Sequence, residues 1–511
     1  MAEIRLVDVS IRDGNQCIWS ATGLRTPQIL QAAPLLERVG FHALDYISST
    51  FMGIAVRMHR EDPWERIRLT RSAAPTTHLQ FIGTGFRFIS WEESSPELMQ
   101  LVYDRLVVAG ISRFIVLDPM HDVDAMRRSA AMVKRAGAPE VMGALTFTLS
   151  PVHDDAFYVG VARVIAEDPN FDRAYVKDPT GMLDPERART LLPAVKAALA
   201  GKTLELHSHC TIGLSPITYP RAPELGVDVL HVAPGPLSNG SSLPDAQRVV
   251  SNLRELGHTV DVDDRALALV AAYFRALASA EGLPVGVPQD YDAAFLRHQV
   301  AGGVLTTTRR QLREVGLEDR FDAVIDEVPR VRAELGYPIM VTPFPQMVCT
   351  QALYNILGAA RYENVPDEVI RYVLARFGRP TSPVDPEVKD RILSLPRARE
   401  LEAEPPPPTV AELRRRFPGV GDEELILRAT MPAEQVDAMR AAGPARRHYN
   451  PHVRPVLALL GELGRRPALS ELVVERAGTR LRVRRDAGHN GDDDRRSDPG
   501  ADGDDEEACA S

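Results

Sequence analysis

The first 260 residues alternate short β-type runs with amphipathic stretches, and this alternation restricts the fold more than any other feature. Stretches with helical periodicity, such as 26–39, 96–109 and 185–200, lie between the runs. The β-type runs cover residues 4–9, 42–46, 80–83, 113–117, 141–146, 173–176, 203–207 and 229–232. Strands that alternate with helices indicate a parallel sheet with crossover helices. Eight repeats favour a closed (β/α)8 TIM barrel, and an open doubly wound sheet is the alternative.

The rest of the chain has a different organisation, and we expect five regions in all. These are a barrel at 1–260, a mainly helical domain at 261–403, a proline spacer with a small helical segment at 404–452, a helix–hairpin at 453–485 and an acidic disordered tail at 486–511. The spacer holds four successive prolines, which favour a stiff extended chain. In the helix–hairpin, two β-type runs flank Ala477-Gly478, which predicts a β-hairpin. The tail is rich in Gly and Asp and nearly lacks large apolar residues.

The bulk composition is that of an ordinary globular protein. Of 511 residues, 44% are hydrophobic and 25% charged, and no apolar run approaches the ~18 residues of a membrane span. Much of the net charge of −10 falls in the acidic tail, and no basic cluster suggests nucleic acid. The four cysteines have neither disulfide-framework nor zinc-ribbon spacing, and the N-terminus lacks a signal-peptide pattern. We therefore expect a cytoplasmic enzyme.

Two histidines end the seventh predicted strand, in the sequence His207-Ser-His209. Residues i and i+2 of a strand point to the same face, so the two imidazoles would aim at one point. Polar segments also follow the first, sixth and eighth strands, at 10–16, 177–181 and 234–242. All of them would gather at the C-terminal face of the barrel, where such barrels hold their active sites. The histidine pair alone is weak support for a metal site. The polar segments expected at the same face of the barrel strengthen that interpretation.

The segments 8–16, 177–181 and 207–209 together resemble a superfamily of barrel metalloenzymes. It unites biotin-dependent carboxyltransferases with the isopropylmalate synthases and hydroxymethylglutaryl-CoA lyases. The resemblance implies that Asp13, His207 and His209 bind a divalent metal. Two imidazoles and a carboxylate suit Zn, Mn or Co and leave a position for a ligand.

Lys177, one of five lysines in the chain, separates the two branches of that superfamily. In the carboxyltransferases of pyruvate carboxylase, oxaloacetate decarboxylase and transcarboxylase, a carbamylated lysine completes the metal sphere, and Lys177 matches it. An unmodified ammonium would be repelled by a dication, whereas a carbamate offers a carboxylate-like oxygen. The alternative is an ordinary lysine at a strand end.

The second half of the chain resembles the carboxyltransferase branch, through the segments 291–307 and 341–351. The resemblance covers about residues 3–440. It implies that Arg12 and Gln16 orient the carbonyl of the acceptor and that Thr306 carries a proton between biotin nitrogen and substrate carbon. Arg12 could equally be a structural salt-bridge partner, and Thr306 could be a helix N-cap.

Several positions depart from the family's pattern. Gly14-Asn15 stands where the carboxyltransferases have Ala-His, and Thr84 stands where they have the arginine that binds the keto acid, although Arg87 lies close by. Loss of a bidentate carboxylate clamp is not conservative, which puts pyruvate or oxaloacetate as the acceptor in doubt. Cys210 replaces an aspartate of many relatives, and we expect it to be a buried packing residue.

The resemblance predicts a carboxyltransferase subunit that moves CO2 between carboxybiotin and a small keto-acid-like acceptor. The alternatives are an acyl-CoA-dependent aldol lyase or Claisen-type synthase, and a non-catalytic scaffold. No lysine has the Met-Lys-Met context of biotin attachment, so a separate biotin carboxyl carrier protein and a biotin carboxylase are the expected partners. Residues 453–485 resemble the start of an acetyl-CoA carboxylase carrier protein, with a generic surface hairpin as the alternative. We also expect a homo-oligomer.

Overall fold

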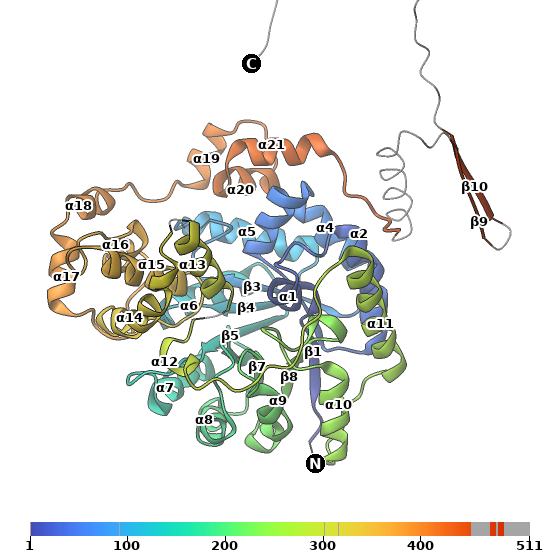
Figure 1. Cartoon of the computed structure of the whole chain (residues 1–511), viewed down its shortest axis with the longest axis horizontal. Coiled ribbons are helices and arrows are strands. Elements are labelled where there is room, and N and C mark those ends of the chain that lie inside the picture. The colour runs from blue at the N-terminus through green and yellow to red at the C-terminus, as the bar shows by residue number, and fades with distance from the viewer. Residues whose placement is uncertain are drawn as a thin grey trace, which may run out of the picture. The chain divides into compact units, whose positions relative to one another are not determined.

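The computed structural model describes residues 2–90, 92–300, 302–314, 316–450, 471–476 and 479–484. The chain forms two units, Met1–Tyr449 and Asn450–Ser511. The first unit is built around a closed barrel whose eight strands neighbour one another in sequence order (Figure 1). The strands are β1 (Arg5–Asp8), β2 (Ala43–Ser48), β3 (His78–Thr84), β4 (Arg113–Leu117), β5 (Glu140–Thr146), β6 (Arg173–Asp178), β7 (Thr203–Ser208) and β8 (Val229–Val232). The predicted TIM barrel is therefore confirmed, and the open sheet is excluded.

All barrel strands pair in parallel, and the register decides which side chains meet. β1 pairs with β8, with Arg5 opposite Val229, and this pairing closes the barrel. β6 and β7 place Lys177 opposite His207. Both residues lie near the carboxyl ends of their strands, so the fold brings them to the C-terminal face of the barrel.

Barrel helices surround the strands, and most begin at an acidic or hydroxyl N-cap. Asp62, Ser95 and Asp245 each accept a hydrogen bond from a backbone N–H of the first helical turn. The barrel helices are α2 (Thr26–Val39), α4 (Pro63–Ala73), α5 (Pro96–Ala109), α6 (Val123–Arg135), α7 (Asp155–Glu167), α8 (Pro185–Ala198), α10 (Ala246–Glu255) and α11 (Asp264–Glu281). The apolar face of α11 belongs to the same hydrophobic cluster as the barrel helices.

Short helical elements occupy the loops that follow the barrel strands. They are η1 (Ser10–Gly14), α1 (Asn15–Ile18), α3 (Ser49–Ile54), η2 (Ala55–His59), α9 (Ser215–Thr218), η3 (Tyr219–Leu225) and η4 (Gly235–Leu237). η1 follows β1 after a single residue and α1 follows η1 directly, so the loop that carries the candidate residues is helical, and its first turn is buried.

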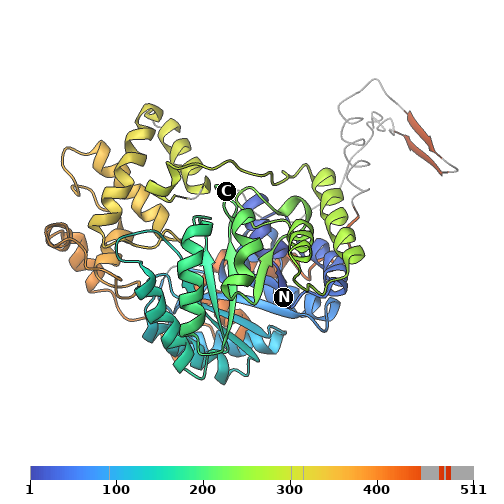
Figure 2. The ribbon, with the colours of Figure 1, turned by 90° about the horizontal axis from the view of Figure 1, so that it is seen from below.

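A second group of helices lies beside the barrel and has its own hydrophobic cluster, drawn in yellow to orange in Figures 1 and 2. The group comprises α12 (Phe295–His298), α13 (Gly302–Glu314), η5 (Glu318–Arg320), α14 (Phe321–Glu334), α15 (Phe344–Leu357), α16 (Asp367–Val373), α17 (Pro386–Leu393) and α18 (Pro396–Glu402). Because α13 begins at Gly302, Thr306 lies inside the helix, and the alternative that it is an N-cap is wrong.

The residues that follow the proline spacer return to the barrel. α19 (Val410–Arg416), α20 (Asp422–Thr430) and α21 (Ala433–Ala442) contribute Leu413, Ile426 and Met439 to the barrel's hydrophobic cluster. The indole Nε1 of Trp64 in α4 donates a hydrogen bond to the carbonyl oxygen of Glu423, at 3.2 Å. These helices are therefore an integral part of the first unit.

The second unit contains the predicted hairpin. β9 (Glu471–Arg476) and β10 (Thr479–Arg484) pair antiparallel, with Thr479 opposite Arg476, which confirms the hairpin. The helix predicted at 453–463 and the tail at 486–511 lie outside the described residues. In the part of the chain that the structure describes, no helix combines the length and apolar character needed to span a membrane.

Candidate metal centre and active site

Three buried side chains converge at the C-terminal face of the barrel, and all three were predicted as metal ligands. Asp13 comes from η1, His207 from β7, and His209 directly follows β7. The Oδ2 atom of Asp13 lies 2.9 Å from His207 Nε2 and 3.6 Å from His209 Nε2, and the two ring nitrogens are 3.1 Å apart. Two ring nitrogens and a carboxylate oxygen thus face one point, which makes a candidate metal site.

The donor set fits a divalent cation. Asp13 Oδ2 is a buried carboxylate oxygen that accepts no well-aligned hydrogen bond from the described residues, so it keeps a lone pair for a cation. The other ring nitrogen of His209, Nδ1, lies 2.7 Å from the carbonyl oxygen of Ser241. A carbonyl can only accept, so Nδ1 carries the proton and Nε2 presents a lone pair to the site.

Two positive side chains adjoin the carboxylate. Arg12 Nη1 lies 3.1 Å and Lys177 Nζ 3.7 Å from Asp13 Oδ2. Burial would raise the pKa of Asp13, but these two charges hold that pKa well below its usual range. Burial lowers the pKa of Lys177, against the opposing effect of Asp13. The carboxylate is therefore ionised and ready to bind a metal.

Arg12 has a second partner that the sequence did not reveal. Its Nη2 forms a short ion pair with Asp45 in β2, and both residues are buried. Arg12 also lines the cavity at the metal site. It can therefore be a structural salt-bridge partner and still orient the acceptor's carbonyl.

A cavity of about 390 Å³ opens onto the candidate metal site. Arg12, Asp13, Gln16, Lys177 and His209 line it from the barrel side. The helical group lines the other side, with Gly303, Val304, Thr307, Thr308 and Gln311 from α13 and Pro345, Gln346 and Thr350 from α15. Thr306 belongs to α13, but its side chain lies outside the described residues. His207 is fully buried and is not among the described residues that line the cavity.

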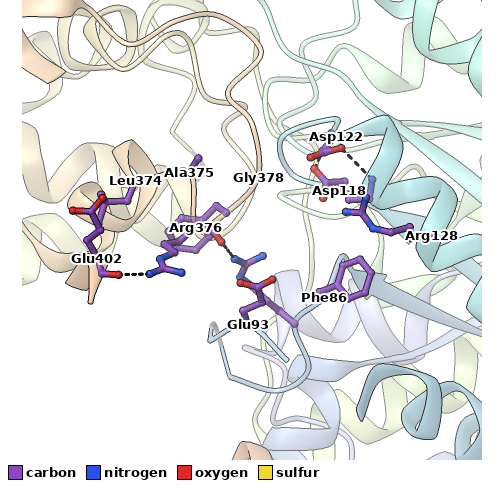
Figure 3. A pocket seen from close by; sticks show the side chains of 13 residues that line it. Phe86, Glu93, Asp118, Asp122, Arg128, Leu374, Ala375, Arg376, Gly378 and Glu402 are labelled. Atoms are coloured by element: carbon purple, nitrogen blue, oxygen red, sulfur yellow. Dashed lines mark hydrogen bonds between the residues drawn. The ribbon is translucent and has the colours of Figure 1, made fainter. Parts of the chain in front are cut away.

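Arg87, which lies close to Thr84 in the sequence, faces a cavity other than the one at the metal site. It lines a second cavity, formed by Phe86 and Asp118 on the barrel side and by residues 374–378 after α16 (Figure 3). Its guanidinium carbon lies 4.7 Å from the centre of the Phe377 ring, and its Nη2 donates to the carbonyl oxygen of Arg376. Neither Thr84 nor Arg87 is among the described residues that line the metal cavity.

Sequence reasoning missed several residues around the metal site. Asp45 contacts Arg12 from another strand, and no local pattern marks it. Ser241 lies within the predicted polar segment 234–242, but the sequence did not indicate that its carbonyl oxygen is the partner of His209. Cys17 Sγ lies 3.5 Å from Asp13 Oδ1. Glu205 could have been found, because it stands two residues before His207 on the same strand and so faces the barrel interior. Cys210, predicted as a packing residue, is buried.

Comparison with known proteins identifies the family. Residues 295–446 match the family described as the conserved carboxylase domain. The chain is 33% identical over 391 residues to a subunit of the pyruvate carboxylase of Methanocaldococcus jannaschii, a match that covers 76% of this chain and 68% of that protein. It is 30% identical to the methylmalonyl-CoA carboxyltransferase 5S subunit of Propionibacterium freudenreichii subsp. shermanii, over 76% of each chain.

A solved structure supports the fold. The carboxyl transferase domain of Rhizobium etli pyruvate carboxylase, solved with pyruvate, superposes with a TM-score of 0.76 at 23% identity, covering 86% of this chain and 77% of that one. The relatives favour carboxyl transfer over the lyase, synthase and scaffold alternatives. The chain therefore belongs to the carboxyltransferase family of biotin-dependent carboxylases, as a carboxyltransferase subunit of the pyruvate carboxylase type.

Proposed function

We propose that this subunit transfers a carboxyl group between biotin on a separate carrier protein and a small keto-acid-like acceptor. In this proposal Asp13, His207, His209 and the carbamate of Lys177 hold a divalent metal. The main support for this proposal is the position of Lys177. It lies opposite His207 in the strand register, and its Nζ is 3.7 Å from Asp13 Oδ2. An ammonium so close to a dication would be strongly repelled, whereas a carbamate adds an oxygen ligand.

The chain's own residues would position the acceptor. A Zn, Mn or Co ion at this site would act as a Lewis acid toward the acceptor's carbonyl. Arg12, fixed by its ion pairs with Asp13 and Asp45, holds a positive charge at the cavity wall. Gln16 in α1 would donate a hydrogen bond from its side-chain amide nitrogen to the same carbonyl. These assignments of Arg12 and Gln16 are supported by their place in the cavity lining.

The cavity favours a small acceptor over one that requires a strong carboxylate clamp. Among its described lining residues, Arg12 and Lys177 are the only arginine and lysine. If Lys177 is a carbamate, Arg12 alone remains, and its Nη atoms already face carboxylates. The hydroxyl and amide groups of α13 and α15 would then bind the rest of the acceptor. Thr306 stays our prediction for the proton carrier.

Transfer assays on the purified protein test this function. We expect oxaloacetate to lose its carboxyl group faster when free biotin is added, and we expect a metal chelator to remove that acceleration. The measurement is pyruvate release, and other 2-oxo acids serve as a panel because of the missing arginine. Cleavage or condensation of an acyl-CoA without any effect of biotin would favour the lyase or synthase alternative.

Partners and location are also part of the proposal. We propose that a biotin carboxyl carrier protein and a biotin carboxylase act with this subunit, that the second unit docks the carrier, and that the subunit self-associates. The described cysteines, Cys17, Cys210 and Cys349, are all free thiols, which supports a cytoplasmic location.

Truncation tests the docking role of the second unit. The shortened chain should end at Tyr449, the last residue of the first unit, and should keep α19–α21, because these helices bury apolar side chains in the barrel's cluster. We expect this chain to keep its metal and to lose co-purification with a biotinylated protein. A chain that ends at Arg485 lacks only the acidic tail and should still bind the carrier. Carrier binding by the shorter chain, or labelling of the full-length subunit itself by streptavidin, would contradict the proposal.

A further inference from the structure

A line of buried polar groups continues from His207 into the barrel interior. Its further members are His231 in β8 and Glu205 in β7, and these three side chains have no exposed surface. His207 Nδ1 lies 3.2 Å from His231 Nδ1. On the other side of its ring, His231 Nε2 lies 3.1 Å from Glu205 Oε2. His207 thus faces Asp13 with one ring nitrogen and His231 with the other.

The two metal-facing histidines differ in what fixes their protons. His209 donates to the carbonyl oxygen of Ser241, which can never donate back. His207 has an imidazole as its partner, and an imidazole nitrogen can be either donor or acceptor. The protonation of His207 therefore depends on which nitrogen of His231 carries its proton.

Glu205 determines which ring nitrogen of His231 carries the proton. Its Oε1 accepts from the guanidinium of Arg113 in a short contact and lies 3.5 Å from Arg173 Nη1. Its Oε2 is the atom that faces His231 Nε2, so that nitrogen carries the proton and donates it. His231 Nδ1 is then an acceptor, and His207 Nδ1 donates to it. His207 Nε2 is left with a lone pair for a cation, on the side of the ring that faces Asp13.

We infer that Glu205 and His231 are positioning residues that hold His207 in the tautomer able to bind the metal. The inference rests on the proposed metal centre and extends it to a carboxylate–histidine–histidine relay. Ring packing supports it, because the Tyr175 ring lies 5.4 Å from the His207 ring and 5.0 Å from the His231 ring, centre to centre. Both imidazoles are thereby held in fixed orientations.

Replacement of Glu205 by glutamine tests the relay without changing its shape. Arg113 can only donate, so the amide oxygen must face it and the amide nitrogen must face His231. The nitrogen would then donate to His231 Nε2, and the His231 proton would move to Nδ1. His207 would have to accept at Nδ1 and carry its own proton on Nε2, the atom that faces the metal.

Two measurements read the result. Zn2+ affinity of the metal-free protein, measured against a competing chelator, should fall about 10–100-fold in Glu205→Gln. Asp13 Oδ2 lies 2.9 Å from His207 Nε2 and would compete for the proton in the metal-free protein, so the NMR measurement is made in the Asp13→Ala background. The spectrum of the ¹⁵N-labelled, metal-free protein should show the His207 proton on Nδ1 in Asp13→Ala and on Nε2 in the Asp13→Ala/Glu205→Gln double variant. This second readout needs neither metal nor activity.

Glu140→Gln is the matched control. Glu140 pairs with the same two arginines, at 3.0 Å from Arg113 and 2.8 Å from Arg173. The substitution removes the same charge, but Glu140 lies on β5, outside the line that joins Glu205 to His231 and His207. Equal weakening of Zn2+ binding by both glutamine variants would overturn the inference. So would a His207 tautomer that does not change when Glu205→Gln is added to Asp13→Ala.

A second variant keeps the test decisive if Glu205→Gln does not fold. His231→Phe preserves a ring against Tyr175 but removes the acceptor for His207, so Zn2+ affinity should again fall about 10–100-fold. Affinity equal to the wild type in His231→Phe would refute the relay. A wild-type protein that binds no Zn2+ would instead refute the metal centre itself, so the two failures are distinguishable.

Discussion

Replacement of His207 or His209 by alanine is expected to strip the divalent ion from the purified protein. Each imidazole is one of three groups whose ligand atoms converge on a single point, and its loss leaves an incomplete coordination sphere. Because loss of an outer hydrogen-bond partner already costs about 10–100-fold in metal affinity, loss of a ligand should cost more than about 100-fold. Metal content by elemental analysis and affinity by chelator competition measure the effect.

Two further variants sharpen this experiment. Asp13→Asn keeps the volume of the side chain but removes the charge that faces both imidazoles, and it should also weaken metal binding. His448→Ala removes an exposed histidine that does not line the metal cavity and should leave metal content unchanged. Unchanged metal stoichiometry in both His207→Ala and His209→Ala would refute the assignment of the metal centre.

Loss of Lys177 is expected to abolish carboxyl transfer between keto acid and free biotin. Lys177→Ala removes the nitrogen that would carry the carbamate. Lys177→Arg keeps a positive charge, but a guanidinium stays protonated and cannot form the carbamate. Both variants should lose at least about 100-fold in exchange rate and should hold metal less tightly, since a ligand is missing.

The carbamate can also be observed directly. Protein equilibrated with ¹³C-labelled bicarbonate should give a carbamate carbon signal in the wild type that is missing in both Lys177 variants. Lys389→Ala, which alters an exposed lysine of α17, should resemble the wild type in signal and exchange rate. Full exchange activity in Lys177→Arg would exclude the carbamate role.

The sequence alone determined the barrel and the centre of its active face. Strand and helix periodicities differ, so the alternation over the first 260 residues located all eight strands, and the bounds of β4 and β8 were predicted without error. The two-residue period of a strand set His207 and His209 on one face. The rule that parallel strands deliver their C-terminal loops to one end then brought Lys177 to the same place. Periodicity and position at a strand end depend only on residues close together in the chain, so they can be predicted from the sequence.

Only the tertiary structure decided how those residues are supported. Arg87 is three residues from Thr84, yet it faces a different cavity, because the loop after β3 turns toward residues 374–378. Asp45, the partner of Arg12, comes from another strand, and no spacing in the sequence encodes that contact. Side-chain partners across a barrel depend on register and packing between distant segments, which periodicity does not report.

Dependence on contacts between distant segments also explains why two larger features were not predicted from the sequence. Glu205 could be oriented from its strand position, but its meeting with His231 depends on the register between β7 and β8. The helices after the proline spacer had the composition of a separate small segment, and only packing against the barrel's hydrophobic cluster revealed that they belong to the first unit. Local composition determines which elements form, whereas the burial of complementary apolar surfaces decides where they dock.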